Sequence, residues 1–438
     1  MRTGPRHSIP RRWLPFVGRK LGMVKSLFDL TIDPDDFDLH HVFPTPTSLG
    51  SLLGRGGGFE ARAGGVGIRL DDAIDRAMGE LLERYASLAF DGGDRIVSSY
   101  AALRSEGRRV VPFETLVPFS REQRLAPGFP YAEFNEDTPI GWIEGINLID
   151  GSPILMPGRL ISFGYIPGRD EVSPCFYPTS SGCAAGASLA GALLSGLLES
   201  IERDAIMVRW YARLAPPLLE IEAADLLGAS LGLQTDGLEV RFHDLTVDGD
   251  VPVVGVTCVE RTGRPCFFLL SAATGLDVRT AARKALLEAG QGRPFIKMLV
   301  NVSPAPGRDA AFNDFDTNLR FFAEPTNAKY VEWFFRNKAV SERRYPPMPD
   351  ASDAAARLRA LLQRCAAMSL TPIAFDMTTP EMEDHGLSAC RVFVPELVQL
   401  CIPSAPFLGH PRLARFIAAA KREGRAESIP GWVPHPFP

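Results

Sequence analysis

The segment GASLAGALLSGLLESIER, residues 186–203, sets out a pattern that the chain repeats twice more. Its first glycine stands thirteen positions before Glu199, and Glu202 follows three positions later with an arginine directly behind it. The segments GIRLDDAIDRAMGELLER (67–84) and GLDVRTAARKALLEAGQGR (275–293) keep the same glycine-to-glutamate spacing. In all three, the sixth and tenth residues after the glycine are alanine or glycine. The chain therefore contains three related segments.

This spacing predicts three helices that each carry a small-residue face and an acidic face. Glycine permits a tight turn at the entry to a helix. Small residues four positions apart lie on one helix face and allow close packing, and two carboxyl or amide groups three positions apart also share a face. The uncharged stretch 180–198 belongs to such a packed helix, because it has too few large apolar side chains to span a membrane.

If the three helices converge, their acidic side chains share one site. Such a cluster cannot stay ionised without cations. Oxygen-only ligands select Mg²⁺ or Mn²⁺, and phosphate oxygens commonly complete the shell of Mg²⁺. The spacing thus predicts a metal–nucleotide site, and the alternative is three ordinary helices with Glu–Arg pairs on solvated faces. The residues concerned are Glu80, Glu83, Glu199, Glu202, Glu288 and Gln291.

Composition is that of a globular protein with a large core. The 438 residues are 45% hydrophobic and 23% charged, and the net charge of −5 gives no global positive field for nucleic acid. The seven cysteines form no CxxC pair, so we expect reduced thiols and a cytoplasmic protein without membrane spans.

Helix and strand signals are interleaved, which favours a mixed α/β (α+β) fold. We expect an N-terminal segment at 1–54, one large domain at 55–438 and an irregular insertion at 301–349. Strands are predicted at 238–245, 251–259, 266–270, 372–376 and 390–394, and an amphipathic helix at 350–365. The aromatic residues Phe321, Phe322, Tyr330, Trp333, Phe334 and Phe335 fit a core better than a peptide-binding surface.

Several motifs together resemble the YcaO family. They are Ser181-Gly-Cys-Ala-Ala-Gly186 with Leu198-Glu-Ser-Ile-Glu-Arg203, Gly64-Gly-Val-Gly67 with Gly79-Glu-Leu-Leu-Glu-Arg84, and Ala285-Leu-Leu-Glu-Ala-Gly-Gln-Gly-Arg293. Phe375-Asp-Met-Thr-Thr-Pro380, His385-Gly-Leu387 and Arg391-Val-Phe-Val-Pro395 also match, so the likeness runs from about residue 55 onward. The chain departs from the family pattern at Val66, where many members have Lys, at Arg76, where Ser is frequent, and at Ala187, where Asn is frequent.

The resemblance implies an enzyme that uses ATP and Mg²⁺ to activate a peptide-bond oxygen. It further implies that the repeated helices pack on β-sheet around a central nucleotide cavity. It assigns metal contacts to Glu80, Glu83, Glu199, Glu202 and Glu288, and cofactor contacts to Arg84, Ser181, Arg203, Gln291 and Arg293. The three departures keep open a degenerate scaffold that binds peptide or partner without using ATP. ATP-dependent thioamide formation is the alternative enzyme activity.

The segment Pro434-His-Pro-Phe-Pro438 favours one branch of that family. In azoline-forming cyclodehydratases a PxPxP end points toward the active site, whereas thioamide-forming relatives generally lack it. The resemblance therefore implies cyclodehydration of Cys, Ser or Thr in a precursor peptide, with the Pro438 carboxylate as a catalytic group. The other interpretation is a frayed proline tail. We expect a separate E1-like or leader-peptide-binding partner, because the length leaves no room for a fused one. The resemblance also allows a flavin dehydrogenase partner and a homodimer.

Overall fold

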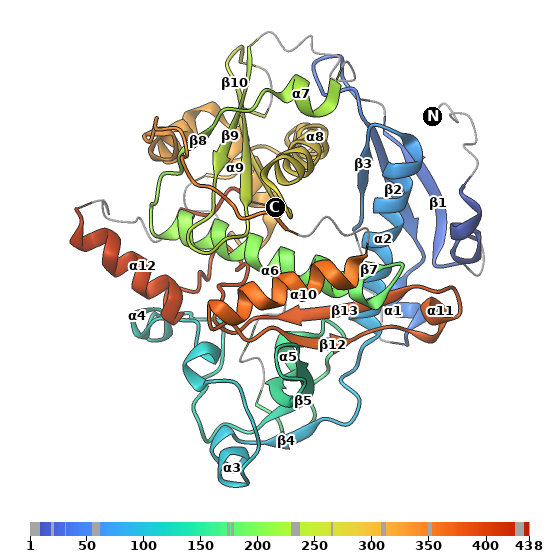
Figure 1. Cartoon of the computed structure of the whole chain (residues 1–438), viewed down its shortest axis with the longest axis vertical. Coiled ribbons are helices and arrows are strands. Elements are labelled where there is room, and N and C mark those ends of the chain that lie inside the picture. Colours follow the sequence, from blue (N-terminus) through green and yellow to red (C-terminus); the bar gives the residue numbers. More distant parts are fainter. Residues whose placement is uncertain are drawn as a thin grey trace.

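The computed structural model describes residues 9–18, 22–30, 32–54, 62–172, 176, 179–228, 237–263, 266–307, 312–348, 353–424 and 433–437. The strands form three antiparallel sheets, and three long helices lie between them (Figure 1). The predicted mixed fold with helices packed on sheet is confirmed.

The first sheet has the order β1 (Val24–Asp29), β2 (His40–Pro46) and β3 (Gly65–Gly67), and helix α2 (Leu70–Ala89) packs on it. Gly65 explains how closely the two meet. A Cβ at Gly65 would lie 2.0 Å from the Ala73 carbonyl oxygen and 2.4 Å from the Ala77 amide nitrogen. The small residues of the repeated pattern are therefore needed where strand and helix backbones touch.

The second sheet has the order β11 (Phe268–Thr274), β10 (Val253–Glu260), β9 (Leu238–Asp244) and β8 (Leu218–Leu219). Helix α8 (Val278–Val302) packs on β10 and β11. The strands predicted at 251–259 and 266–270 are confirmed, and they pair as a hairpin with Val259 opposite Phe268. The predicted core role of the aromatic insertion is also confirmed, since Phe321, Phe322, Trp333 and Phe334 are buried.

The third sheet has the order β4 (Ile96–Ser98), β5 (Ile140–Asn147), β12 (Ile373–Asp376), β13 (Ser388–Phe393) and β7 (Cys183–Gly186), with β6 (Pro153–Pro157) paired to β5. Helix α6 (Leu189–Tyr211) lies across β13 and β7 and also contacts β11, so it joins the second and third sheets. Helix α10 (Ala354–Ala367), capped by Asp353, covers α6 and confirms the predicted helix near its expected place. Figure 1 shows α6 at the centre of the molecule.

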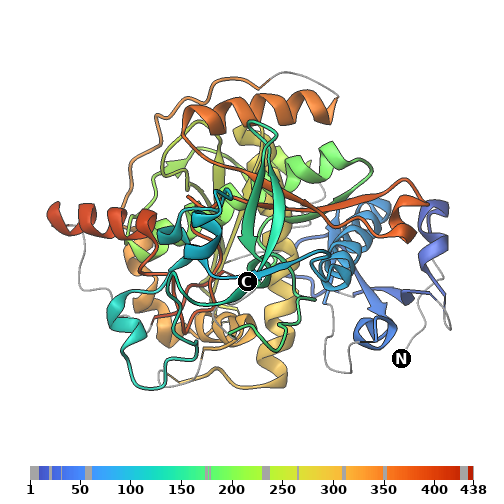
Figure 2. The ribbon, with the colours of Figure 1, turned by 90° about the horizontal axis from the view of Figure 1, so that it is seen from below.

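Shorter elements complete the chain. They are η1 (Arg11–Phe16), α1 (Leu49–Leu52), α3 (Tyr100–Ser105), η2 (Phe113–Leu116), α4 (Arg121–Arg124), α5 (Gly158–Ile161), α7 (Ala223–Leu227), α9 (Phe315–Ala323), η4 (Pro325–Tyr330), η5 (Glu332–Phe335), α11 (Pro380–Glu383) and α12 (Pro411–Arg422). In the view of Figure 2, α12 (red) stands out at one side, away from the N-terminal sheet (blue).

The predicted boundary at residue 54 stays a prediction. Strands β1 and β2 precede it, yet β2 pairs with β3, which follows it. No helix within the described ranges is long and apolar enough to cross a membrane. The six cysteines that the structure describes are all buried and free, as the spacing of the cysteines predicts.

Candidate active site

The glutamates of α2 and α6 are held in the same way by the backbone in front of their helices. The Gly64 amide donates to Glu80 Oε2 at 2.9 Å, and the Gly182 amide donates to Glu199 Oε2 at 3.1 Å. Glu202 turns toward the second sheet, where the Thr274 amide donates to its Oε2 at 2.9 Å. A backbone N–H group therefore fixes the orientation of each of these three carboxylates.

In α2 and in α6, an arginine four residues after the first glutamate forms an ion pair with that glutamate. Arg84 lies 3.2 Å from a carboxylate oxygen of Glu80 and 3.2 Å from one of Glu83. Arg203 lies 3.2 Å from Glu199 Oε1. Arg84 and Arg203 thus bind the predicted metal ligands of their own helices, which orients the carboxylates and offsets part of their charge.

The electrostatics of Glu83 show that the first two helices converge. Burial raises the pKa of Glu83 to about 8; Arg84 opposes this, whereas the carboxylates of Glu199 and Glu80 add to it. Carboxylates from α2 and α6 are thus near enough to repel one another.

The third helix joins the same cluster through Glu288. Burial raises the pKa of Glu288 to about 8, and the Glu202 carboxylate is the next cause; Lys284 acts in the opposite direction. Burial also raises the pKa of Glu202, with Lys284 and Arg203 opposing and Glu199 adding to the rise. Gln291 lies on the same face of α8, beside Gly64, where an added Cβ would lie 2.6 Å from its Nε2. The six predicted acid and amide side chains therefore form one linked group.

This group fits a divalent cation and phosphate. Its donors are carboxylate and amide oxygens, the ligand set that Mg²⁺ prefers. Its repelling carboxylates need a positive charge to stay ionised together. Ser181 adds a second indication, because its hydroxyl oxygen is buried and has no hydrogen-bond partner among the described residues. A buried hydroxyl without a partner is costly, so a bound ligand oxygen is a fitting acceptor there.

Arg293 departs from its predicted place. Its side chain is fully buried and lies 3.3 Å from Asp36 Oδ1, 3.5 Å from Asp35 Oδ2 and 3.8 Å from Glu260 Oε2. The sequence pattern placed it with Arg84 and Arg203, but it is one residue further along its helix. One residue turns a helix by about 100°, so the guanidinium leaves the acidic face.

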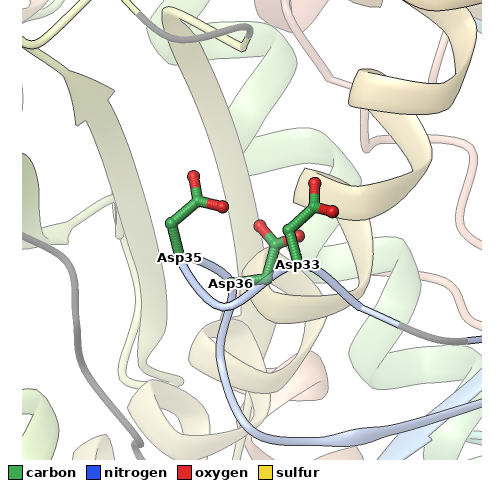
Figure 3. Close-up of side chains that lie close together, drawn as sticks. All are labelled: Asp33, Asp35 and Asp36. Carbon is green, nitrogen blue, oxygen red and sulfur yellow. The ribbon is translucent and has the colours of Figure 1, made fainter.

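Beside Arg293, the three carboxylates of Asp33, Asp35 and Asp36 lie close together (Figure 3). Lys297 already supplies their cation, with its Nζ 3.4, 3.0 and 2.9 Å from oxygens of the three in that order. These ion pairs fasten residues 33–36 to α8.

The residues before Pro438 are docked beside the site. Val433, His435 and Phe437 are buried, and the Arg203 guanidinium carbon lies 4.6 Å from the centroid of the Phe437 ring. The His435 Nε2 lies 2.9 Å from the Cys401 carbonyl oxygen. The frayed-tail interpretation is therefore wrong for 433–437, while Pro438 lies outside the described residues.

Two side chains of this region were not predicted from the sequence. Lys284 lies one helical turn before Glu288, and the repeated spacing could have pointed to it. Arg391 is fully buried behind the site, where its Nη1 donates to the carbonyls of Thr179 and Ile161 at 2.6 and 3.2 Å. Arg391 thus supports the loop that carries Ser181 and Gly182.

Comparison with known proteins places this geometry in a family. Residues 64–398 match the family model described as YcaO cyclodehydratase, ATP- and Mg²⁺-binding. The chain belongs to the YcaO family. The sequence-based assignment is therefore confirmed, together with the class of ATP-dependent enzymes and with ATP and Mg²⁺ as the cofactors of the family.

Two curated relatives each match less than half of the chain. An uncharacterised protein of Methanothermobacter thermautotrophicus is 30% identical over 228 residues, which are 47% of this chain and 59% of that protein. An uncharacterised protein in the tfuA 3′ region of Rhizobium leguminosarum bv. trifolii is 27% identical over 197 residues, 43% of each chain. The chain thus spans about half the length of the curated relatives it matches.

Solved structures share the fold over nearly the whole chain. A heterocyclase in complex with substrate and cofactor superposes with a TM-score of 0.72 at 19% identity, covering 97% of this chain and 55% of that one. YcaO from Methanopyrus kandleri bound with AMPPCP and Mg²⁺ gives 0.59 at 20% identity, covering 87% and 88%. The E. coli microcin synthetase McbBCD complex with pro-MccB17 bound gives 0.63 at 13% identity, covering 94% and 96%.

Proposed function

We propose that this chain catalyses the ATP-dependent cyclodehydration of Cys, Ser or Thr residues in a ribosomal precursor peptide, giving thiazoline or oxazoline rings. The docked segment 433–437 is the observation that carries this proposal. It is the proline-rich feature associated with azoline-forming YcaO proteins, and its Phe437 ring contacts Arg203 of the acidic cluster. The same cluster supplies the carboxylates that an ATP- and Mg²⁺-dependent reaction requires.

In this proposal the side chain of Cys, Ser or Thr attacks the preceding amide carbonyl. This attack closes the ring, and the resulting oxyanion accepts a phosphoryl group from ATP, with release of ADP. Loss of the amide N–H proton and departure of phosphate then form the C=N bond of the azoline. Glu80, Glu83, Glu199, Glu202 and Glu288 would hold Mg²⁺, while Gln291 and the Ser181 hydroxyl would contact the nucleotide. Arg84 and Arg203 keep the carboxylates oriented, so that little reorganisation is needed when charge develops.

The proposed catalytic role of the Pro438 carboxylate requires that the proline-rich segment before it be stiff. A proline-rich segment is extended and loses little entropy when it is fixed in place. Phe437 lies under Arg203, which bonds Glu199 of the acidic cluster. Pro438 directly follows Phe437 in the sequence, so we propose that its carboxylate acts at this cluster. A carboxylate there acts on substrate only within about 3 Å of the transferred proton, or through one water.

Partners belong to the proposal as well. The microcin synthetase relative is a complex with pro-MccB17 bound, which supports a precursor peptide as substrate and a separate protein that presents it. We propose an E1-like or leader-peptide-binding protein in that role, and a flavin dehydrogenase where azolines are oxidised further.

The decisive measurement is loss of water from a precursor peptide, read by mass spectrometry in the complete system with ATP and Mg²⁺. The matched variant carries one glycine inserted between Phe437 and Pro438, which displaces Pro438 by up to about 3.5 Å. We expect cyclisation to be crippled in this variant while nucleotide binding persists.

Three outcomes would contradict parts of the proposal. Equal cyclisation rates for the wild type and the insertion variant would reject a positioned carboxylate. Exchange of oxygen for sulfur in the peptide would establish thioamidation instead. No ATP turnover in the complete system would identify a scaffold, the reading that the departures at Val66, Arg76 and Ala187 allow.

A further inference from the structure

An aromatic pair lies on the face of the first sheet that α2 does not cover. Val42 on β2 is buried against α2, so the next residue, Phe43, points to the opposite face. Phe43 is paired with Phe28 on β1, and the two rings stack with their centroids 5.6 Å apart. Phe28 is nevertheless 51% exposed, so the Phe28–Phe43 stack presents an aromatic surface to solvent.

This stack adjoins the acidic cluster. The Gly64 amide donates to Glu80, and a Cβ added at Gly64 would lie 3.0 Å from the Phe43 ring. The same Cβ would lie 2.6 Å from Gln291 Nε2, so Phe43 and Gln291 are neighbours at Gly64. The aromatic surface therefore begins beside the side chains that we assign to metal and nucleotide.

A second apolar surface leads away from the cluster along helix α8. Phe295, Met298 and Val302 follow Gln291 at intervals of four, three and four residues, which places all of them on one helix face. Met298 is 46% exposed and Val302 is 82% exposed, although both are apolar. We call these three residues the α8 stripe. From Gln291 to Val302 the helix rises by about 16 Å, at 1.5 Å per residue.

Gln291 is thus the point from which both apolar surfaces start, where α8 contacts β3 of the first sheet (Figure 1). Exposed apolar side chains that are contiguous with a functional site mark a binding surface. A nucleotide held at the cluster by its phosphates has a single base, which can cover the stack but not the length of the α8 stripe as well. An extended peptide rises about 3.3 Å per residue, so about five residues match the length of the stripe.

We propose that the Phe28–Phe43 stack and the α8 stripe bind an extended apolar segment of the precursor peptide, next to the residue that is cyclised. Apolar peptide side chains that bind there leave water together with Phe28, Met298 and Val302, which favours binding. This inference rests on the proposed function and adds a class of substrate sequence to it.

Synthetic peptides labelled with fluorescein test this surface. The probes are Leu-Thr-Phe-Thr-Leu-Gly-Cys-Gly and Gly-Cys-Gly-Leu-Thr-Phe-Thr-Leu, which place the apolar segment before or after the cysteine. In two matched polar peptides, serine replaces every leucine and phenylalanine. We would measure binding to the full chain by fluorescence anisotropy, with Mg²⁺ and a non-hydrolysable ATP analogue present. At least one apolar probe should bind about tenfold more tightly than its polar counterpart.

Substitutions on the two surfaces locate the binding. Phe28→Ser and Met298→Ser change exposed side chains, so the fold should be retained. Each should weaken binding of the apolar probe by about fivefold and leave the affinity for the ATP analogue within about twofold. Leu125→Ser is the matched control and should bind as the wild type does. Leu125 is 72% exposed at the end of α4, on the other side of the molecule from β1 (Figure 1).

The inference would be overturned if the apolar and polar probes bound alike, or if neither serine variant weakened binding of the apolar probe. A loss of affinity for the ATP analogue in both variants would instead identify a nucleobase site. Conversion of a wild-type dimer to a monomer by these variants, measured by light scattering, would identify a subunit interface.

Failure of the proposed function is a separate result. Loss of water from a peptide in the complete system would uphold cyclodehydration even where the apolar surface plays no part in binding. A chain that binds the apolar probe as expected, while no peptide loses water in the complete system, would reject cyclodehydration and retain the peptide-binding surface.

Discussion

Arg203 lies over the ring of Phe437, with its guanidinium carbon 4.6 Å from the ring centroid. The same guanidinium donates to Glu199 Oε1 at 3.2 Å, so one side chain links the acidic cluster to the docked segment 433–437. A cation held over an aromatic face gains on the order of 0.5–2 kcal/mol. The docked segment therefore contributes to the orientation of Arg203, which in turn bonds Glu199.

Replacing Phe437 by Leu tests this link, because leucine keeps an apolar side chain but removes the aromatic face. We expect the rate of ATP-dependent cyclisation to fall by about fivefold, which corresponds to roughly 1 kcal/mol. Phe416→Leu is the matched control, since Phe416 lies under Arg412 and Arg415 on α12. Steady-state kinetics of the two variants should differ, and equal rates would contradict a role for the Arg203–Phe437 contact.

Charge removal at the acidic cluster should abolish turnover without unfolding the chain. Glu199→Gln and Glu202→Gln each keep an oxygen that can accept the Gly182 or Thr274 amide hydrogen bond. Both remove a charge that its neighbours repel, so the metal-free stability should stay equal or rise. ATP hydrolysis with peptide and partner should fall by orders of magnitude. The exposed Glu106→Gln serves as control, and wild-type hydrolysis in both site variants would refute their assigned role.

The sequence predicts the packing of the three helices well, because backbone contact between a strand and a helix tolerates few residue types. A Cβ at Gly275 would lie 2.7 Å from the Ala281 amide nitrogen, and one at Gly186 would lie 3.3 Å from the Ala192 amide nitrogen. The glycine at the start and the small residue six positions later are thus two halves of one contact. Because both residues of this contact lie within seven positions of the chain, the spacing of small residues in the sequence predicts it.

The orientation of individual charges is less predictable. Arg293 follows its glutamate one position later than Arg84 and Arg203 do, and that single step moves it to another helix face. Its partner Asp36 lies 257 residues away along the chain, and no local pattern announces such a contact. The docking of residues 433–437 is also not predictable from local sequence. The prolines indicate a stiff segment, but they do not indicate which surface it packs against.

Three buried histidines predict a loss of stability in mild acid. Burial lowers the pKa of His243 to about 3, and that of His410 and His435 to about 4. The unfolded chain titrates near 6.5, so it binds these protons first as the pH falls. Stability from the neutral imidazoles is complete above about pH 6.5 and declines toward pH 4, by up to roughly 3 kcal/mol for each histidine.

Thermal unfolding of the wild type and of His435→Gln at pH 7 and pH 5 measures this effect. Glutamine can still donate to the Cys401 carbonyl, but it does not titrate. The variant should therefore lose less stability between the two pH values than the wild type does. An equal loss in both proteins would show that His435 does not contribute to the acid sensitivity.

Arg293 provides the sharpest contrast between the predicted and the observed site. As a phosphate ligand it would be dispensable for folding and needed for nucleotide binding. In the structure it is a buried partner of Asp36 and Glu260, and removing one member of a buried ion pair costs about 3–5 kcal/mol. Arg293→Met should thus lower the free energy of unfolding in urea by that amount. Its folded fraction should bind the ATP analogue within about twofold of the wild type, because the guanidinium does not face the acidic cluster.

Two companion variants keep this prediction testable if Arg293→Met does not fold. Arg293→Lys retains one charge and should cost less stability, again with unchanged nucleotide affinity. Arg203→Met should show the opposite behaviour, since Arg203 bonds Glu199 at the cluster: nucleotide affinity falls while most of the stability is retained. A chain in which Arg293→Lys loses nucleotide affinity at undiminished stability would instead restore Arg293 as a phosphate ligand. For Arg293 to contact phosphate, its ion pairs with Asp35 and Asp36 would have to break when nucleotide binds. Residues 33–36 would then separate from α8.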